Sequence, residues 1–137
     1  MKILALDLGD SRIGVAVSDE MHIIANGLET YSRQNLSCDL MHIADLCSKH
    51  NVGEIVIGLP INMDGSEGER VQKSRQFGEL LSKQLPDVKI EYIDERLTTI
   101  SAERVLLEAD VSREKRKKVI DKVASTIILQ SYLDIKK

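Results

Sequence analysis

The first 30 residues carry three short stretches whose apolar spacing is typical of β-strands. Residues 3–8 form an apolar run interrupted only by Asp7, which predicts a strand buried on both faces at the centre of a sheet. Residues 13–18 follow a Gly-Asp-Ser turn, and residues 22–30 supply a third run of β type. The chain is therefore predicted to open with an antiparallel meander.

Helical spacing begins only after this meander. Leu36, Leu40, Ile43 and Cys47 recur at the spacing of one face of a helix. The elements predicted after the meander are a helix at 36–50, a strand at 54–58, a helix between the turn at 64–68 and Pro86, a strand at 88–93, and helices at 98–109 and 113–133. Strands separated by helices need crossovers and are expected to be parallel. We therefore expect an α/β fold, with a mixed five-stranded sheet flanked by helices.

Length and composition narrow the protein class. A chain of 137 residues has room for one hydrophobic core, so we expect a single domain over 1–137. It has no run of about 18 apolar residues, so we expect neither a membrane span nor a signal peptide. We therefore expect a cytoplasmic location. Aromatic residues make up 3% of the chain, which argues against a single-strand binding surface built from stacked rings.

Charge is unevenly distributed along the chain. Residues 1–111 contain 11 Lys and Arg against 19 Asp and Glu, whereas residues 112–137 contain 8 against 3. The basic segment could attract phosphate over roughly 8–10 Å. A solvated helix face is the alternative explanation of the same residues.

Three acidic residues stand out. Asp7 interrupts a buried-type strand, where a carboxylate is costly unless it is paired or bound to a cation. Glu95 follows the fifth strand, at the sheet edge where ligands of open α/β sheets bind. Asp121 lies at the edge of the apolar stripe of the last helix. Each alone could be a capping or surface residue.

Together, the three acids predict a metal centre. Carboxylates from two strand ends and a covering helix would repel one another unless a divalent cation lay between them. Mg²⁺ or Mn²⁺ held in this way supports phosphodiester cleavage. Phosphates would then contact the turn at 58–68, which leads into a helix. They would also contact the basic side chains of Arg12, Arg96, Lys115, Arg116, Lys117 and Lys118.

The sequence excludes a zinc site and the common nucleotide-binding motifs. Cys38, His42, Cys47 and His50 resemble a zinc-binding set. On a single helix, however, Cys47 and His50 would point away from Cys38 and His42, so the four side chains could not bind one zinc ion. The phosphate-loop and dinucleotide-binding spacings of glycine are both missing.

The chain resembles the YqgF/RuvX family of ribonuclease H-like nucleases over essentially its whole length. The motifs that carry the resemblance are Ala5-Leu6-Asp7-Leu8-Gly9 with Arg12-Ile13-Gly14-Val15-Ala16, Gly58-Leu59-Pro60 with Asn62-Met63-Asp64-Gly65, Asp94-Glu95-Arg96-Leu97-Thr98-Thr99, and Lys117-Lys118 through Asp121 to Gln130. The resemblance implies a ribonuclease H-like sheet and a metal-dependent acidic site at Asp7, Glu95 and Asp121. It also places Asn62 among the nucleic-acid contacts.

The expected function is therefore that of a Mg²⁺- or Mn²⁺-dependent nuclease acting on structured nucleic acid, processing the 5′ region of the 16S rRNA precursor. A Holliday junction resolvase is the alternative within nucleases, and it would require a dimer rather than a monomer. Outside nucleases, the alternatives are a non-catalytic RNA-binding assembly factor and an actin-like ATPase. The length of the chain argues against the ATPase, which binds nucleotide between two domains of this kind.

Overall fold

A computed structural model describes residues 1–97 and 113–136 of the chain, with side chains at residues 1–96 and 123–135. The helix predicted at 98–109 lies outside the described residues.

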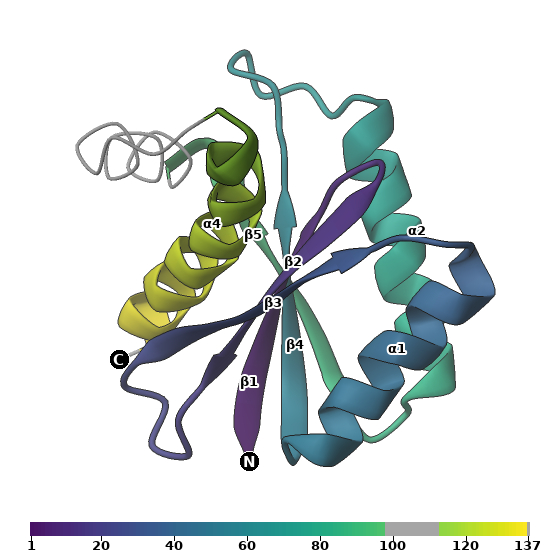
Figure 1. Cartoon of the computed structure of the whole chain (residues 1–137), viewed down its shortest axis with the longest axis vertical. Coiled ribbons are helices and arrows are strands. Elements are labelled where there is room, and N and C mark those ends of the chain that lie inside the picture. Colours follow the sequence, from purple (N-terminus) through teal and green to yellow (C-terminus); the bar gives the residue numbers. More distant parts are fainter. Residues whose placement is uncertain (98–112, 137) are drawn as a thin grey trace.

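The five strands within the described residues form one sheet (Figure 1). They are β1 (Lys2–Leu8), β2 (Arg12–Ser18), β3 (Ala25–Ser32), β4 (Val52–Leu59) and β5 (Lys89–Asp94). Their order across the sheet is β3-β2-β1-β4-β5. The first three strands pair antiparallel, whereas β4 and β5 run parallel to β1. The predicted mixed five-stranded sheet is confirmed, with Asp7 on its central strand.

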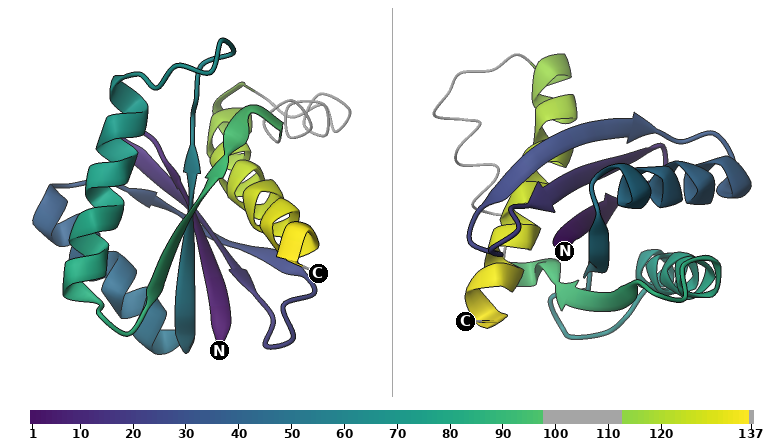
Figure 2. Two further views of the ribbon diagram at one scale, coloured as in Figure 1. Left: turned by 180° about the vertical axis from the view of Figure 1, so that it is seen from behind. Right: turned by 90° about the horizontal axis from the view of Figure 1, so that it is seen from below.

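Helices cover both faces of the sheet. The helices α1 (Leu36–Lys49) and α2 (Glu69–Gln84) pack on one face, and α4 (Arg113–Lys136) packs on the other (Figures 1 and 2). The helix α4 begins near the edge where β1, β4 and β5 end, and it runs toward the opposite edge (Figure 1). No helix among the described residues combines the length and hydropathy needed to cross a membrane.

Alternation along β1 divides the core between the two faces. Leu4, Leu6 and Leu8 belong to the cluster formed with α1 and α2. Ile3 and Ala5 belong to the cluster formed with α4. Both faces of this strand are therefore buried, which explains its almost unbroken apolar run.

The third strand begins three residues later than the apolar pattern predicts. The backbone N–H groups of Ile23 and Ile24 donate to Asp19 Oδ1 at 2.7 and 3.0 Å, which closes a turn. His22 in this turn has a φ of 57°, in the left-handed region that strands do not use. The two isoleucines that suggested a strand are therefore exposed turn residues.

Packing of α4 can be tested at Leu129, which is fully buried against the sheet. Leu129→Ala should lower the free energy of unfolding by about 2–5 kcal/mol, because apolar contact is lost and a cavity remains. Ile135 lies on the same helix but is 71% exposed, so Ile135→Ala should change this free energy by less than about 0.5 kcal/mol. Urea denaturation measures both, and equal small losses would contradict the packing described.

Candidate active site

The ends of three parallel strands bring the first two predicted acids to one edge of the sheet. The pairing of Leu6 with Ile57 places Asp7 level with Gly58 of β4. Gly58 in turn pairs with Ile93 of β5. Glu95 follows β5 directly, as the first residue of the 3₁₀ turn η1 (Glu95–Leu97). Asp7 and Ile93 therefore flank Gly58 at the same level, and Glu95 lies two residues farther along, just past the end of β5.

Both acids belong to the face of the sheet that α4 covers. Asp7 continues the series of Ile3 and Ala5, whose side chains pack against α4. Ile93 packs against the same cluster. Residue parity thus assigns the Asp7 side chain to the layer between the sheet and α4.

Gly58 leaves the space through which the two acids meet. A Cβ atom at this position would lie 2.8 Å from Glu95 Cγ, 2.9 Å from Glu95 Cδ and 2.7 Å from Ile128 Cδ1. These separations are shorter than real Cβ contacts, so any side chain on β4 here would displace Glu95. The absence of a side chain at Gly58 lets Glu95 lie across β4 and hydrogen-bond Asp7.

Burial and like charge act together on this pair. Glu95 is only 9% exposed. The pKa of Glu95 is raised to about 8, and burial is the largest cause. The charge of Asp7 and the hydrogen bond between the two carboxyl groups raise this pKa further, whereas the Arg70 guanidinium lowers it. A hydrogen bond between two carboxyl groups requires a proton on one of them. Near neutral pH, Asp7 and Glu95 therefore share one proton. A cation bound at the same place would also be stabilised, because it would lie between two carboxyl groups.

The third predicted acid, Asp121, lies in α4, and its side chain is outside the described residues. Its position in the helix is one turn before Ser125 and two turns before Ile128, both of which are buried. Ile128 is the residue that approaches Gly58. The basic run Lys115, Arg116, Lys117 and Lys118 lies in the first turns of α4, again with side chains outside the described part.

Arg96 is held by Asp94 at the end of β5. The Arg96 backbone N–H donates to Asp94 Oδ1 at 2.9 Å, and its Nε donates to Oδ2 at 2.8 Å. This pairing lowers the pKa of Asp94. Asp94, which stands next to Glu95 in the chain, therefore orients the Arg96 guanidinium.

The remaining predicted nucleic-acid contacts lie on the loops and strand ends around this edge. Arg12 is half-buried at the start of β2. Asn62 is exposed on the loop between β4 and α2, where its Nδ2 donates to Ser66 Oγ at 3.0 Å. The backbone N–H groups of Asn62, Gly65 and Ser66 are used within this loop, where they donate to Ser66 O, Asn62 O and Asp64 Oδ1. The loop is thus a hydrogen-bonded turn, with fewer free donors than its sequence suggests.

Sequence reasoning missed two residues of this edge. The sequence analysis places Gly58 at the end of the strand at 54–58 and the start of a turn but gives it no role at the acid pair, although a glycine that ends a buried strand is a recognisable sign of close side-chain approach. Arg70, whose charge acts on Glu95, gives no sequence signal beyond its place in the first turn of a helix.

The chemistry of the acid pair fits a hard divalent cation. Carboxylate oxygens are the ligands that Mg²⁺ and Mn²⁺ prefer. Within the described residues, no three His, Cys, Asp or Glu side chains are grouped to hold a metal. The structure thus brings Asp7 and Glu95 together as two of the three predicted ligands.

The pH dependence of stability tests the buried pair. Because the pKa of Glu95 is raised from 4.5 to about 8, the folded protein holds a proton that the unfolded chain releases between these values. Without divalent metal, the free energy of unfolding should fall as pH rises through this window. Glu95→Gln should flatten this dependence. Exposed Glu79→Gln should preserve it, and an unchanged slope in both variants, measured by urea denaturation, would contradict the buried pair.

The chain is similar in sequence to one protein family over nearly its whole length. The family model described as "RuvX: Holliday junction resolvase" matches residues 1–135. A protein of Halothermothrix orenii named "Putative pre-16S rRNA nuclease" is 54% identical over 134 residues, covering 98% of this chain and 95% of that protein. A protein of Myxococcus xanthus with the same name is 51% identical, covering 98% of this chain and 88% of that protein.

Solved structures share the fold at low sequence identity. RuvC of Thermus thermophilus in complex with a Holliday junction substrate aligns with a TM-score of 0.63 at 11% identity, covering 99% of this chain and 95% of RuvC. The fowlpox virus resolvase in complex with Holliday junction DNA aligns with a TM-score of 0.61 at 12% identity, covering 99% of both chains. The ribonuclease H-like sheet is thereby confirmed. Because the family model spans nearly the whole sequence and these relatives share about half of its residues, the chain belongs to the RuvX family.

Proposed function

We propose that this protein is a nuclease that uses Mg²⁺ or Mn²⁺ to hydrolyse phosphodiester bonds in structured RNA, and that its substrate is the 5′ region of the 16S rRNA precursor. Residues 1–137 would form one ribonuclease H-like nuclease domain. The observation that carries this proposal is the buried pair of Asp7 and Glu95 at the edge where β1, β4 and β5 end.

The pair supports metal-dependent rather than metal-free hydrolysis. Two carboxyl groups in contact at a buried position repel each other once both are ionised, and a divalent cation removes that cost. Asp7, Glu95 and Asp121 would hold the cation. When bound, it would supply an activated water and charge stabilisation at the leaving oxygen.

The surrounding residues would bind and orient the nucleic acid. Arg96 is fixed by Asp94 beside the acid pair, so its guanidinium is held ready for a phosphate. Arg12, Asn62 and the basic run at 115–118 would add phosphate contacts that carry little sequence information. Gly58 would act by keeping open the space that Glu95 occupies.

The names of the relatives support the choice of substrate. Proteins about half identical over nearly the whole chain carry the name of a nuclease of pre-16S rRNA. A nuclease that processes precursor rRNA would work in the cytoplasm.

A four-way DNA junction is the second candidate substrate, because the family model carries the description Holliday junction resolvase. A symmetric junction would need two active sites and hence a homodimer. Incubation with a precursor rRNA leader and with a four-way junction, under the same divalent metal, separates these candidates. Selective cleavage of the leader supports rRNA processing, and selective cleavage of the junction by a dimer supports the second candidate.

Asp7→Asn tests the catalytic assignment. It should reduce the rate of leader cleavage by at least about 100-fold, because one metal-binding oxygen is replaced by an amide while the side-chain shape is kept. Thermal unfolding should show that the variant still folds. Cleavage at the wild-type rate would overturn the assignment, and a wild-type protein that binds the leader without cutting it would indicate an RNA-binding assembly factor instead.

Gly58→Ala tests the positioning of Glu95. The added methyl would push Glu95 away from Asp7, and we expect kcat to fall by about 10- to 100-fold, since displacements of about 1 Å can have this effect. Gly53→Ala is a matched control on the same strand, because the nearest atoms to its methyl would belong to the flexible, exposed Met1 side chain. Equal kcat values for the two variants would show that Gly58 does not position Glu95.

A further inference from the structure

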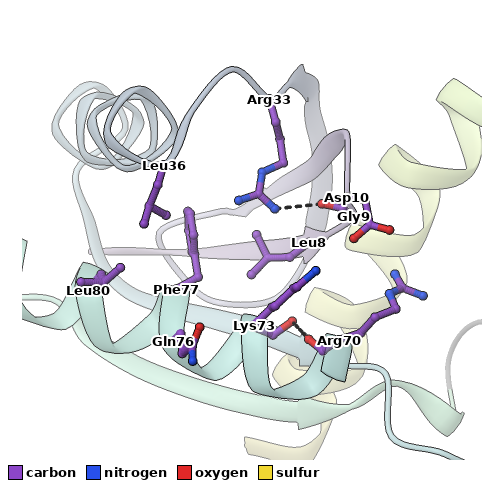
Figure 3. A pocket seen from close by; sticks show the side chains of 11 residues that line it. Leu8, Gly9, Asp10, Arg33, Leu36, Arg70, Lys73, Gln76, Phe77 and Leu80 are labelled. Carbon is purple, nitrogen blue, oxygen red and sulfur yellow. Dashed lines mark hydrogen bonds between the residues drawn. The ribbon is translucent and has the colours of Figure 1, made fainter. Parts of the chain in front are cut away.

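A cavity of about 160 Å³ lies at the end of β1, on the face of the sheet that α1 and α2 cover (Figure 3). One part of its wall is apolar, formed by Leu8, Leu36, Phe77 and Leu80. The rest carries charged side chains, which are Asp10, Arg33, Arg70 and Lys73. None of the cationic three was predicted to contact nucleic acid.

The charge of Arg33 is used within the protein. Its Nε donates to Asp39 Oδ2 at 2.9 Å, and its other guanidinium nitrogen donates to Gly9 O at 2.9 Å. The guanidinium also lies over the Phe77 ring, 5.6 Å from its centroid. Arg33 is therefore part of the fixed wall of the cavity.

Arg70 and Lys73 are the cations that remain available. Among the described residues, no hydrogen bond or ion pair holds the Arg70 side chain, although its charge acts on Glu95. Lys73 has an exposed partner, Glu69, at 3.6 Å, and such surface pairs contribute little. Figure 3 shows Arg70 and Lys73 rising from α2 toward the end of β1, where Asp10 lies.

The cavity continues into a second one of about 440 Å³, which also reaches Ser11, Gln34 and Asn35. Both are lined by Asp10, Arg33, Leu36 and Lys73, so they are neighbouring parts of one groove. The groove is lined from Leu8 onward, which directly follows Asp7 in the chain, and it leads toward the beginning of α1. A strand bound at the acid pair could thus cross the end of β1 and enter it.

We propose that this groove binds the nucleic-acid strand next to the cleaved bond, with Arg70 and Lys73 contacting one phosphodiester group. The inference rests on the proposed nuclease function and adds the path of its substrate. Arg70 offers a planar fork that matches phosphate oxygens, and Lys73 adds a point charge. The apolar wall, with Leu36 47% exposed, favours a nucleotide over a free inorganic anion, because sugar and base carbon atoms can pack against it.

Binding of a labelled single-stranded oligoribonucleotide, followed by fluorescence anisotropy from about 50 to 200 mM KCl, tests this path. Asp7→Asn blocks cleavage during the measurement and serves as the parent. The test variant adds Arg70→Gln and Lys73→Gln. The matched control adds Lys49→Gln and Lys83→Gln, which also remove two exposed cations from α1 and α2 but lie in the last turns of these helices.

The test variant should bind roughly tenfold more weakly at low salt, and its salt slope should fall by about 0.7 for each lost phosphate contact. The control should keep the parent's slope. In the cleavage-competent protein, Lys73→Gln alone should raise KM severalfold with kcat unchanged. Thermal unfolding should show that all variants fold.

Two failures are distinguishable. If the wild-type protein cleaves the leader while the test variant and the control bind alike, the groove is overturned and the nuclease function stands. If the wild-type protein binds and cleaves neither RNA nor the four-way junction, the proposed nuclease function is overturned. The proposed substrate path through the groove is then overturned as well.

Discussion

The contact between Glu95 and Asp7 is the constraint on which the candidate active site of this protein depends. Two carboxyl groups meet at a position with little access to water, so one must keep a proton or both must share a cation. The fold tolerates this cost because the apolar packing on both faces of β1 and β4 is extensive. A costly arrangement of this kind, retained at a sheet edge, is characteristic of a site that binds a charged partner.

The sheet topology creates this contact. Because β4 lies between β1 and β5 and all three run in the same direction, their carboxyl ends share one edge. β4 must then present no side chain at the level of Asp7, and Gly58 meets this need. The same edge receives the beginning of α4 on one face and the beginning of α2 on the other (Figure 1).

Charge is divided across the edge in a way that suits a polyanion. The acid pair lies on the α4 face, whereas Arg70 and Lys73 lie on the α2 face beside the end of β1. Arg96, fixed by Asp94, directly follows Glu95 in η1. Under the proposed function, this acidic centre would hold cations near the scissile phosphate, and the basic side chains on the second surface would contact a neighbouring phosphate, so the protein would need no net positive charge.

The amino-acid sequence alone predicted the order of the described elements, the mixed sheet, the central place of Asp7 and the location of Glu95 at a strand end. These follow from apolar periodicity and from the rule that crossover-connected strands are parallel. It misplaced the start of β3, because the Asp19 side chain closes a turn that apolar periodicity does not reveal. Two contacts emerge only in the folded protein: Glu95 crosses β4 over Gly58, and Arg70 reaches the same edge. They could not be predicted because they depend on strand register and helix placement, which join residues far apart in the chain.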